Sequence, residues 1–142
     1  MVLPPPIKYL WALPASLLGL VVAAFAKVLG ARVAVIRGVV EITLAPRNAL
    51  TRRLSGRGRI SAITFGHVVI AASAEDQTRL RSYERVHVAQ YEKWGPLFLL
   101  AYSAESVFQL LRGRRPYIDN RFEVQARRLS TLNFNLVVRN DA

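Results

Sequence analysis

Two residues in one short stretch have the spacing of a hydrolytic zinc motif, but the residue that should complete the motif differs. The stretch SYERVHVAQYEKWGP contains Glu84 and His87, and Tyr83 stands where a first histidine would be needed. In the motif H-E-x-x-H, two histidines one helical turn apart bind zinc and the glutamate polarises the metal-bound water. The stretch is therefore a metal site, the remnant of one, or an ordinary helix.

Composition restricts the chemistry that these residues could perform. The 142 residues include no cysteine and two histidines, which excludes thiolate ligands, disulfides and thiol nucleophiles, so a metal would need His, Asp or Glu. The second histidine, His67, lies in the strand-like residues 60–72, where a hydrogen-bonded structural role is the simpler interpretation. With 20 basic and 9 acidic residues, the net charge of +11 favours an anionic partner, which could be lipid headgroups, nucleic acid or an acidic protein surface.

The helix that must position these residues has clear boundaries. Ser73 is a favoured N-cap and is followed by two acidic residues, while Gly95 comes just after the last turn. These signals predict one helix of about twenty residues between them. On such a helix Tyr83 and His87 share a face one turn apart, and Glu84 projects beside them.

Two further elements follow this helix. Pro96 and Gly113 bound an apolar second helix, and we expect Glu105 within it to face outward rather than to take part in catalysis. Asn120 and Glu123 have the spacing of a capping box, so a short helix should begin near Asn120. The tail TLNFNLVV alternates apolar and polar or smaller residues, which predicts a closing strand.

The middle of the chain is typical of strands and a basic loop. β-Branched residues dominate RVAVIRGVVEITLAP, and Arg37-Gly38 offers a two-residue turn, so we expect a hairpin. The arginine-rich residues 47–59 are either a solvated loop or a contact for phosphate or lipid headgroups. Because no aromatic residue is interleaved with those charges, nucleic-acid binding is the weaker interpretation.

The N-terminal residues 9–26 carry no charge and are flanked by Lys8 and Lys27. At 1.5 Å per residue, eighteen residues cover roughly 27 Å, which is just enough for a thin hydrocarbon layer. The pattern favours a membrane helix that spans the bilayer or lies on it, over a buried soluble helix or a signal peptide. If it spans, the basic residues that follow place the folded part on the cytoplasmic side of the inner membrane.

Three stretches together resemble a known family: ITFGHVVIAA, YERVHVAQYEKWGPLF and PYIDNRFEVQA. They are similar to small bacterial zincin-like proteins of the glutamate-zincin kind, which often carry an N-terminal hydrophobic segment. The resemblance covers roughly residues 8–127. It implies that Glu84 is the catalytic glutamate, that His87 is the second histidine ligand, and that Glu123 is a carboxylate ligand supplied by a later helix.

The sequence departs from this family pattern at its most important position. Tyr83 replaces the first histidine, and Arg121 and Gln125 replace a proline and a glutamate of the pattern. A phenol with a pKa near 10 loses its proton at neutral pH only at a cost of about 4 kcal/mol, so zinc binding by Tyr83, His87 and Glu123 is disfavoured.

The sequence therefore predicts an α+β fold with an N-terminal hydrophobic membrane helix (residues 1–30) and a zincin-like domain (residues 31–142), whose small antiparallel sheet packs on the helices. The function that we expect is that of a membrane-associated, non-catalytic accessory or assembly subunit without a cofactor, docking to anionic lipid and to protein subunits of a larger membrane complex. The alternative is a membrane-tethered zinc metallopeptidase that uses Glu84.

Overall fold

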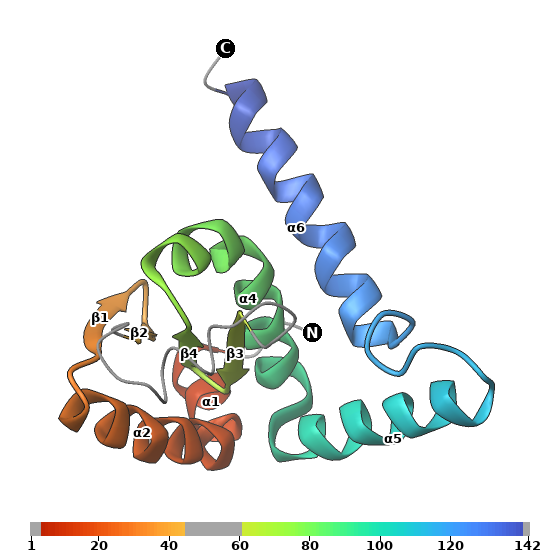
Figure 1. Cartoon of the computed structure of the whole chain (residues 1–142), viewed down its shortest axis with the longest axis horizontal. Helices are drawn as coiled ribbons and strands as arrows, with labels where there is room; N and C mark the ends of the chain where they lie inside the picture. The colour runs from red at the N-terminus through yellow and green to blue at the C-terminus, as the bar shows by residue number, and fades with distance from the viewer. Residues whose placement is uncertain (1–3, 45–60, 141–142) are drawn as a thin grey trace.

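The computed structural model describes residues 4–44 and 61–140, and their fold is α+β, as predicted (Figure 1). The elements are α1 (Pro5–Trp11), α2 (Leu13–Val28), β1 (Arg32–Ile36), β2 (Val39–Thr43), β3 (Ala62–Phe65), β4 (Val68–Ala71), α4 (Ala74–Trp94), η1 (Gly95–Leu97), α5 (Phe98–Leu111) and α6 (Arg121–Asn140). The arginine-rich residues 47–59 fall outside the described part of the chain.

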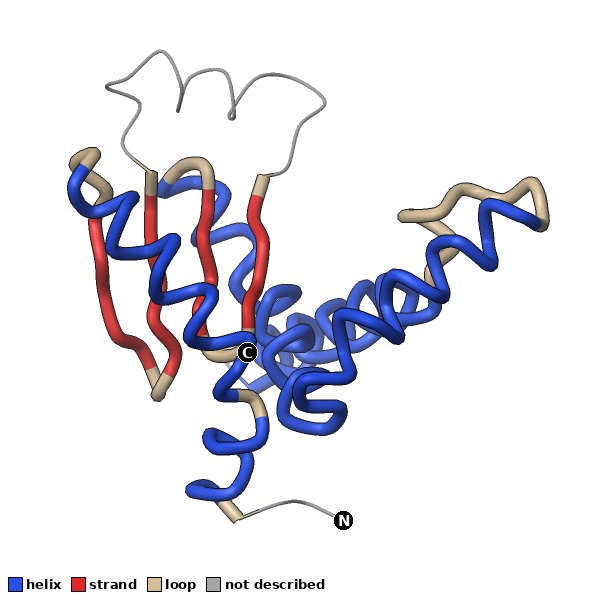
Figure 2. The backbone as a smooth tube through the Cα atoms, turned by 90° about the horizontal axis from the view of Figure 1, so that it is seen from below, coloured by secondary structure: helices blue, strands red, loops and turns tan. Residues whose placement is uncertain are grey.

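The four strands form one mixed sheet in the order β1-β2-β4-β3 (Figure 2). The outer pairs, β1 with β2 and β3 with β4, are antiparallel hairpins, whereas β2 and β4 are parallel. The prediction of a purely antiparallel sheet was therefore wrong at its centre. Hairpin signals in a sequence specify pairing within each hairpin but not how two hairpins join.

Both hairpins turn at residues in the left-handed region of backbone conformation. Arg37 and Gly38 have φ values of 49° and 75°, as a tight two-residue hairpin turn requires, which confirms the first hairpin. The strand-like residues 60–72 contain two strands, β3 and β4, because Gly66, with φ of 58°, allows the chain to reverse between them. His67 therefore lies in a turn and not within a strand.

A helix covers each face of the sheet (Figure 1). Small residues of α2 pack on one face, where a Cβ added to Gly19 would lie 2.7 Å from Cβ of Val68. Val88 of α4 packs against Val39 and Val69 on the other face. Because α4 lies against β3 and β4, its position and rotation are set by the sheet, which fixes the direction of its functional side chains.

The apolar N-terminal stretch is divided between α1 and α2, with the break at Ala12. Pro14 explains the break, because it lacks the N–H that would bond to the carbonyl of Leu10 in one continuous helix. Within residues 4–44 and 61–140, none of the helices combines the length and the apolar character needed to cross a membrane.

The C-terminal segment is helical, so the predicted closing strand over residues 131–138 was wrong. Helix α6 continues to Asn140 and projects away from the sheet (Figure 1). No glycine or proline lies between Arg121 and Asn140, so nothing in the local sequence stops the helix once Asn120 has started it.

Candidate functional site

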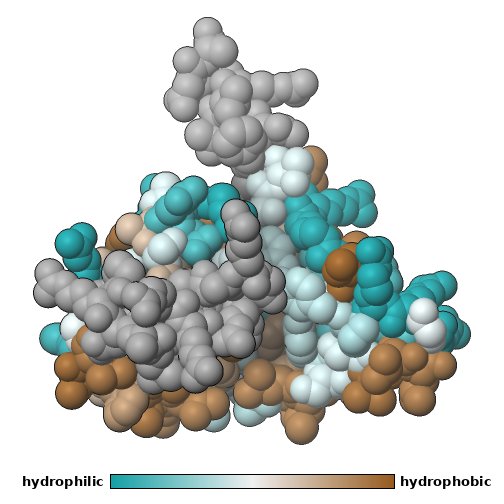
Figure 3. Space-filling model, in the orientation of Figure 1, coloured by the Kyte–Doolittle hydropathy of each residue, from teal (hydrophilic) through white to brown (hydrophobic). Residues whose placement is uncertain are grey.

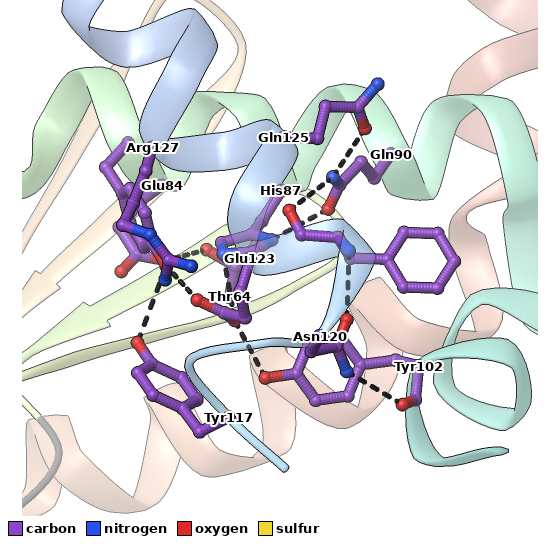
Figure 4. A network of polar contacts seen from close by, with 12 residues as sticks. Thr64, Glu84, His87, Gln90, Tyr102, Tyr117, Asn120, Glu123, Gln125 and Arg127 are labelled. Carbon is purple, nitrogen blue, oxygen red and sulfur yellow. Dashed lines mark hydrogen bonds and ion pairs between the residues drawn. The ribbon is translucent and has the colours of Figure 1, made fainter. Parts of the chain in front are cut away.

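Helices α4 and α6 bring together the four residues that the sequence singled out. Tyr83, Glu84 and His87 come from α4 and Glu123 comes from α6. Nε2 of His87 lies 3.5 Å from Oε1 of Glu123, and the Tyr83 hydroxyl donates a hydrogen bond to Oε2 of the same carboxylate. The chain thus places a half-buried phenol beside a buried imidazole and a buried carboxylate in one cluster between the two helices, and Figure 4 shows His87 and Glu123 side by side.

The Tyr83 side chain occupies the position where a first ligand would be expected. Its ring meets the His87 ring edge-on, with the ring centroids 5.1 Å apart and the planes at 85°. Burial raises the pKa of the Tyr83 hydroxyl, and the hydrogen bond to Glu123 raises it further. The phenol therefore remains a protonated hydrogen-bond donor, which is the opposite of what a metal-binding phenolate requires.

Both carboxylate oxygens of Glu123 are engaged within the protein. One accepts from Tyr83, and the other accepts from the hydroxyl of Tyr102 of α5 at 2.7 Å. The capping-box interpretation of Glu123 was incomplete: Asn120 does cap α6 through Phe122 N–H at 2.9 Å, but the Glu123 side chain faces the tyrosines. Since Glu123 is only 3 % exposed, these hydroxyls replace the water that would otherwise solvate its charge.

Gln90 orients the imidazole of His87, a role that the sequence reasoning missed. Its amide nitrogen donates to the carbonyl of Phe122 at 3.0 Å and to Oε1 of Gln125 at 2.8 Å. Its amide oxygen must then accept from Nδ1 of His87, 2.8 Å away (Figure 4). This arrangement directs Nδ1–H to Gln90 and leaves Nε2 facing Glu123 at 3.5 Å, the ring nitrogen through which such an oriented histidine could bind a metal. The available signal was the three-residue spacing of His87 and Gln90.

Glu84 lies beside this cluster and is itself buried, with 5 % exposure. The hydroxyl of Thr64 in β3 donates to its Oε2 at 2.6 Å. Burial is the largest influence on this carboxyl and raises its pKa, although the Thr64 hydrogen bond opposes the shift. A raised pKa is compatible with proton transfer, but it also follows from burial alone.

The donor set is poor for a divalent metal. In the described part of the chain, no three His, Cys, Asp or Glu side chains form a group that could hold a metal ion. His87 and Glu123 are the residues best placed to act as ligands, and Tyr83 is the third group beside them. A catalytic zinc site normally needs three good protein ligands and an open position for water.

The other candidate residues have structural partners. His67 is buried, and its Nε2 lies 3.1 Å from Oε1 of Glu92, which also forms an ion pair with Lys8 at 3.0 Å. Glu105 is not turned outward as expected, because it is largely buried and accepts from Gln109 at 2.7 Å. Both lie outside the Tyr83–Glu123 cluster.

No family model, curated protein or solved structure matches this chain.

Proposed function

We propose that this protein is a membrane-associated, non-catalytic accessory or assembly subunit, built on a degenerate zincin-like scaffold and docking to a larger membrane complex. The observation that supports this proposal most directly is the hydrogen bond from Tyr83 to Glu123. The protonated phenol fills the first ligand position and binds the carboxylate that would otherwise be a ligand.

The energetics of the cluster favour this closed state. Opening it for zinc would require breaking hydrogen bonds from Tyr83 and Tyr102 to a buried carboxylate. Hydrogen bonds to a charged group contribute about 1.5–3 kcal/mol each, and deprotonating a phenol whose pKa is raised adds to that cost. Zinc would gain His87 and Glu123 as good ligands, which leaves its coordination incomplete.

The membrane part of the proposal depends on the sequence and on charge. The net charge of +11 favours anionic lipid over a neutral surface, at about 1 kcal/mol for each basic residue held near it. The apolar N-terminal residues 1–30 would supply the hydrophobic part of the attachment.

Zinc content tests the proposal directly. Purified wild-type protein and the Tyr83→Phe variant should hold no stoichiometric zinc after dialysis, measured by elemental analysis. Tyr83→His should bind one zinc per chain, because it adds an imidazole one turn from His87 and beside Glu123. The double variant Tyr83→His, Glu123→Gln is the matched control and should lose that zinc.

Two results would contradict the proposal in different ways. One tightly held zinc in the wild type, with peptidase activity that Glu84→Gln abolishes, would establish the metallopeptidase alternative. The orientation of His87 Nε2 toward Glu123 is the observation that keeps this alternative open. A Tyr83→His variant that folds but gains no zinc affinity would show that the cluster is not zincin-like.

A further inference from the structure

Helices α2 and α5 expose a large apolar surface, which we call the α2–α5 face. In Figure 3 it forms a hydrophobic band along the lower edge of the molecule, over α2 on one side and α5 on the other. Its most exposed side chains are Val21, Phe25 and Val28 of α2 and Leu100, Leu110 and Leu111 of α5. Val28 and Leu111 are 84 % and 82 % exposed, so the protein itself leaves these side chains in water. A contiguous apolar surface of this kind indicates an interaction site.

The two helices are held in a fixed relation at the centre of this face. Both begin near the middle of the molecule and diverge outward to different sides of it (Figures 1 and 2). The indole of Trp11, just before α2, packs on Gly95, where an added Cβ would lie 2.4 Å from the ring. Ala12 and Ala15 then pack against Phe98 at the start of α5. Because the junction is close-packed, the α2–α5 face is continuous.

Cationic residues lie at both outer ends of this face. Lys27 lies in the last turn of α2, and Arg32 follows as the first residue of β1. Arg112, Arg114 and Arg115 follow α5, where Arg115 pairs with Asp119 at 3.6 Å. Helix α2 contains no acidic residue between these ends. In α5 the single acidic residue is Glu105, whose carboxylate faces Gln109 and Arg121 and is 14 % exposed. The surface is therefore apolar in its centre, and its two ends each carry a net positive charge after Asp119 is counted against Arg115.

A lipid bilayer fits this pattern better than a protein partner does. A protein interface usually combines an apolar centre with a polar rim whose groups both donate and accept hydrogen bonds. Here α2 and α5 are roughly 24 and 21 Å long, and cationic residues lie near the outer end of each. Amphipathic helices that lie in the interfacial plane bury their apolar side about 5–10 Å deep and are attracted to anionic lipid by their cations.

We propose that the α2–α5 face lies flat in the surface of an anionic membrane, with Val28 and Leu111 in the acyl boundary and the terminal cations at the phosphates. This inference rests on the proposed membrane role and specifies its mode: α5 contributes as much as the N-terminal segment, and neither helix crosses the bilayer.

Binding of the full-length protein to sedimented vesicles tests this proposal. Vesicles of phosphatidylcholine with phosphatidylglycerol should bind the wild type, and vesicles of phosphatidylcholine alone should bind it much more weakly. The Arg112→Gln, Arg114→Gln, Arg115→Gln variant should lose roughly a hundredfold in affinity for the anionic vesicles, at about fivefold per charge. Leu100→Gln with Leu111→Gln should lose at least as much, even for anionic vesicles.

Matched controls are available on α6, which leaves the molecule away from this face (Figure 1). Arg128→Gln and Leu129→Gln replace exposed residues of the same kinds and should change vesicle binding by less than about twofold. Circular dichroism establishes that each variant is folded. Binding that depends on the α2–α5 face but not on α6 supports the proposal.

Three outcomes would overturn it: no binding to anionic vesicles, equal losses for the α2–α5 and α6 variants, or a wild-type oligomer that Leu100→Gln with Leu111→Gln dissociates. The last would identify a second copy of the chain as the occupant. Failure here is distinguishable from failure of the proposed function, because zinc content does not depend on lipid. Tyr83→His should bind vesicles like the wild type, whatever its metal affinity.

Discussion

Replacing Tyr83 by phenylalanine tests whether the phenol closes the cluster between α4 and α6. The substitution keeps the ring, and therefore its edge-on contact with His87, but removes the hydroxyl that donates to Glu123. Glu123 is left with Tyr102 as a close donor, at 2.7 Å, and with His87 at 3.5 Å. The same hydroxyl also lies 3.5 Å from the Tyr117 hydroxyl, so the change removes one hydrogen bond to a buried carboxylate and one longer contact between neutral groups.

The expected loss of stability follows from the charge and burial of the acceptor. A hydrogen bond to a charged group contributes about 1.5–3 kcal/mol, whereas one between neutral groups contributes about 0.5–1.5 kcal/mol. Tyr83→Phe should therefore destabilise the protein by about 2 kcal/mol, equivalent to a fall in Tm of roughly 6 °C for a chain of this size. In a Glu123→Gln background the same substitution should cost about 1 kcal/mol, because the acceptor is then neutral.

A double-mutant cycle on Tyr83 and Glu123, measured by denaturant unfolding, gives the coupling between the two side chains directly. We expect a coupling of about 1 kcal/mol or more, and Tyr91→Phe provides a control ring in the same helix. If the two substitutions prove additive, the phenol does not stabilise the carboxylate. The argument that Tyr83 has replaced a metal ligand would then fail.

Two further predictions concern two other buried carboxyl groups, Glu84 and Glu41. Burial raises the pKa of Glu84 above its ordinary value of 4.5, so protonation of Glu84 stabilises the fold fully below pH 4.5, and this stabilisation is lost as the pH rises through the folded-state pKa. The Tm of the wild type should therefore fall over that pH range, and Glu84→Gln, which cannot ionise, should show a smaller fall. Parallel Tm profiles for the two proteins would contradict this prediction. Glu41 is 3 % exposed and is paired with Arg81 at 3.0 Å and with Arg85 at 2.9 Å. Replacing both arginines by alanine should lower the free energy of unfolding in urea by about 3–5 kcal/mol, because it leaves a buried charge unpaired, whereas the exposed control Arg79→Ala should lower it by less than about 1 kcal/mol. A loss of stability no larger than that of the control would contradict this prediction.

The features that the sequence predicted correctly are those specified by local signals. Ser73 accepts from the N–H of Asp76 at 3.0 Å as the N-cap of α4, and Gly95 ends that helix with φ of 57°. The Arg37-Gly38 turn likewise depends on two residues alone. The placement of Glu123 opposite His87 came from the family resemblance, because no local signal relates residues that lie on different helices.

The features that sequence reasoning missed depend on contacts between distant elements. Tyr102 and Gln90 were unremarkable helix residues until packing brought α5 and α6 against α4. The parallel pairing of β2 with β4 has the same origin. The strand prediction for residues 131–138 failed because alternation over a few residues is weak evidence beside an uninterrupted helix.

The N-terminal stretch shows how mean hydropathy can obscure a packing pattern. Ala15, Gly19, Ala23 and Ala26 recur at spacings of three or four residues, and all four are buried against the sheet or α5. Larger residues such as Val21 and Val28 occupy the opposite side of α2. Small residues at this spacing indicate close helix packing, so the sequence did contain evidence that one side of this segment faces protein.

Helix α5 connects the two proposals, because its sides face different surroundings. Tyr102 and Phe98 face inward, where Tyr102 donates to Glu123 and Phe98 contacts the rings of Tyr91 and Phe122. Leu111 and its apolar neighbours face outward on the α2–α5 face. The two assays, zinc content and vesicle binding, therefore examine opposite sides of the same helix.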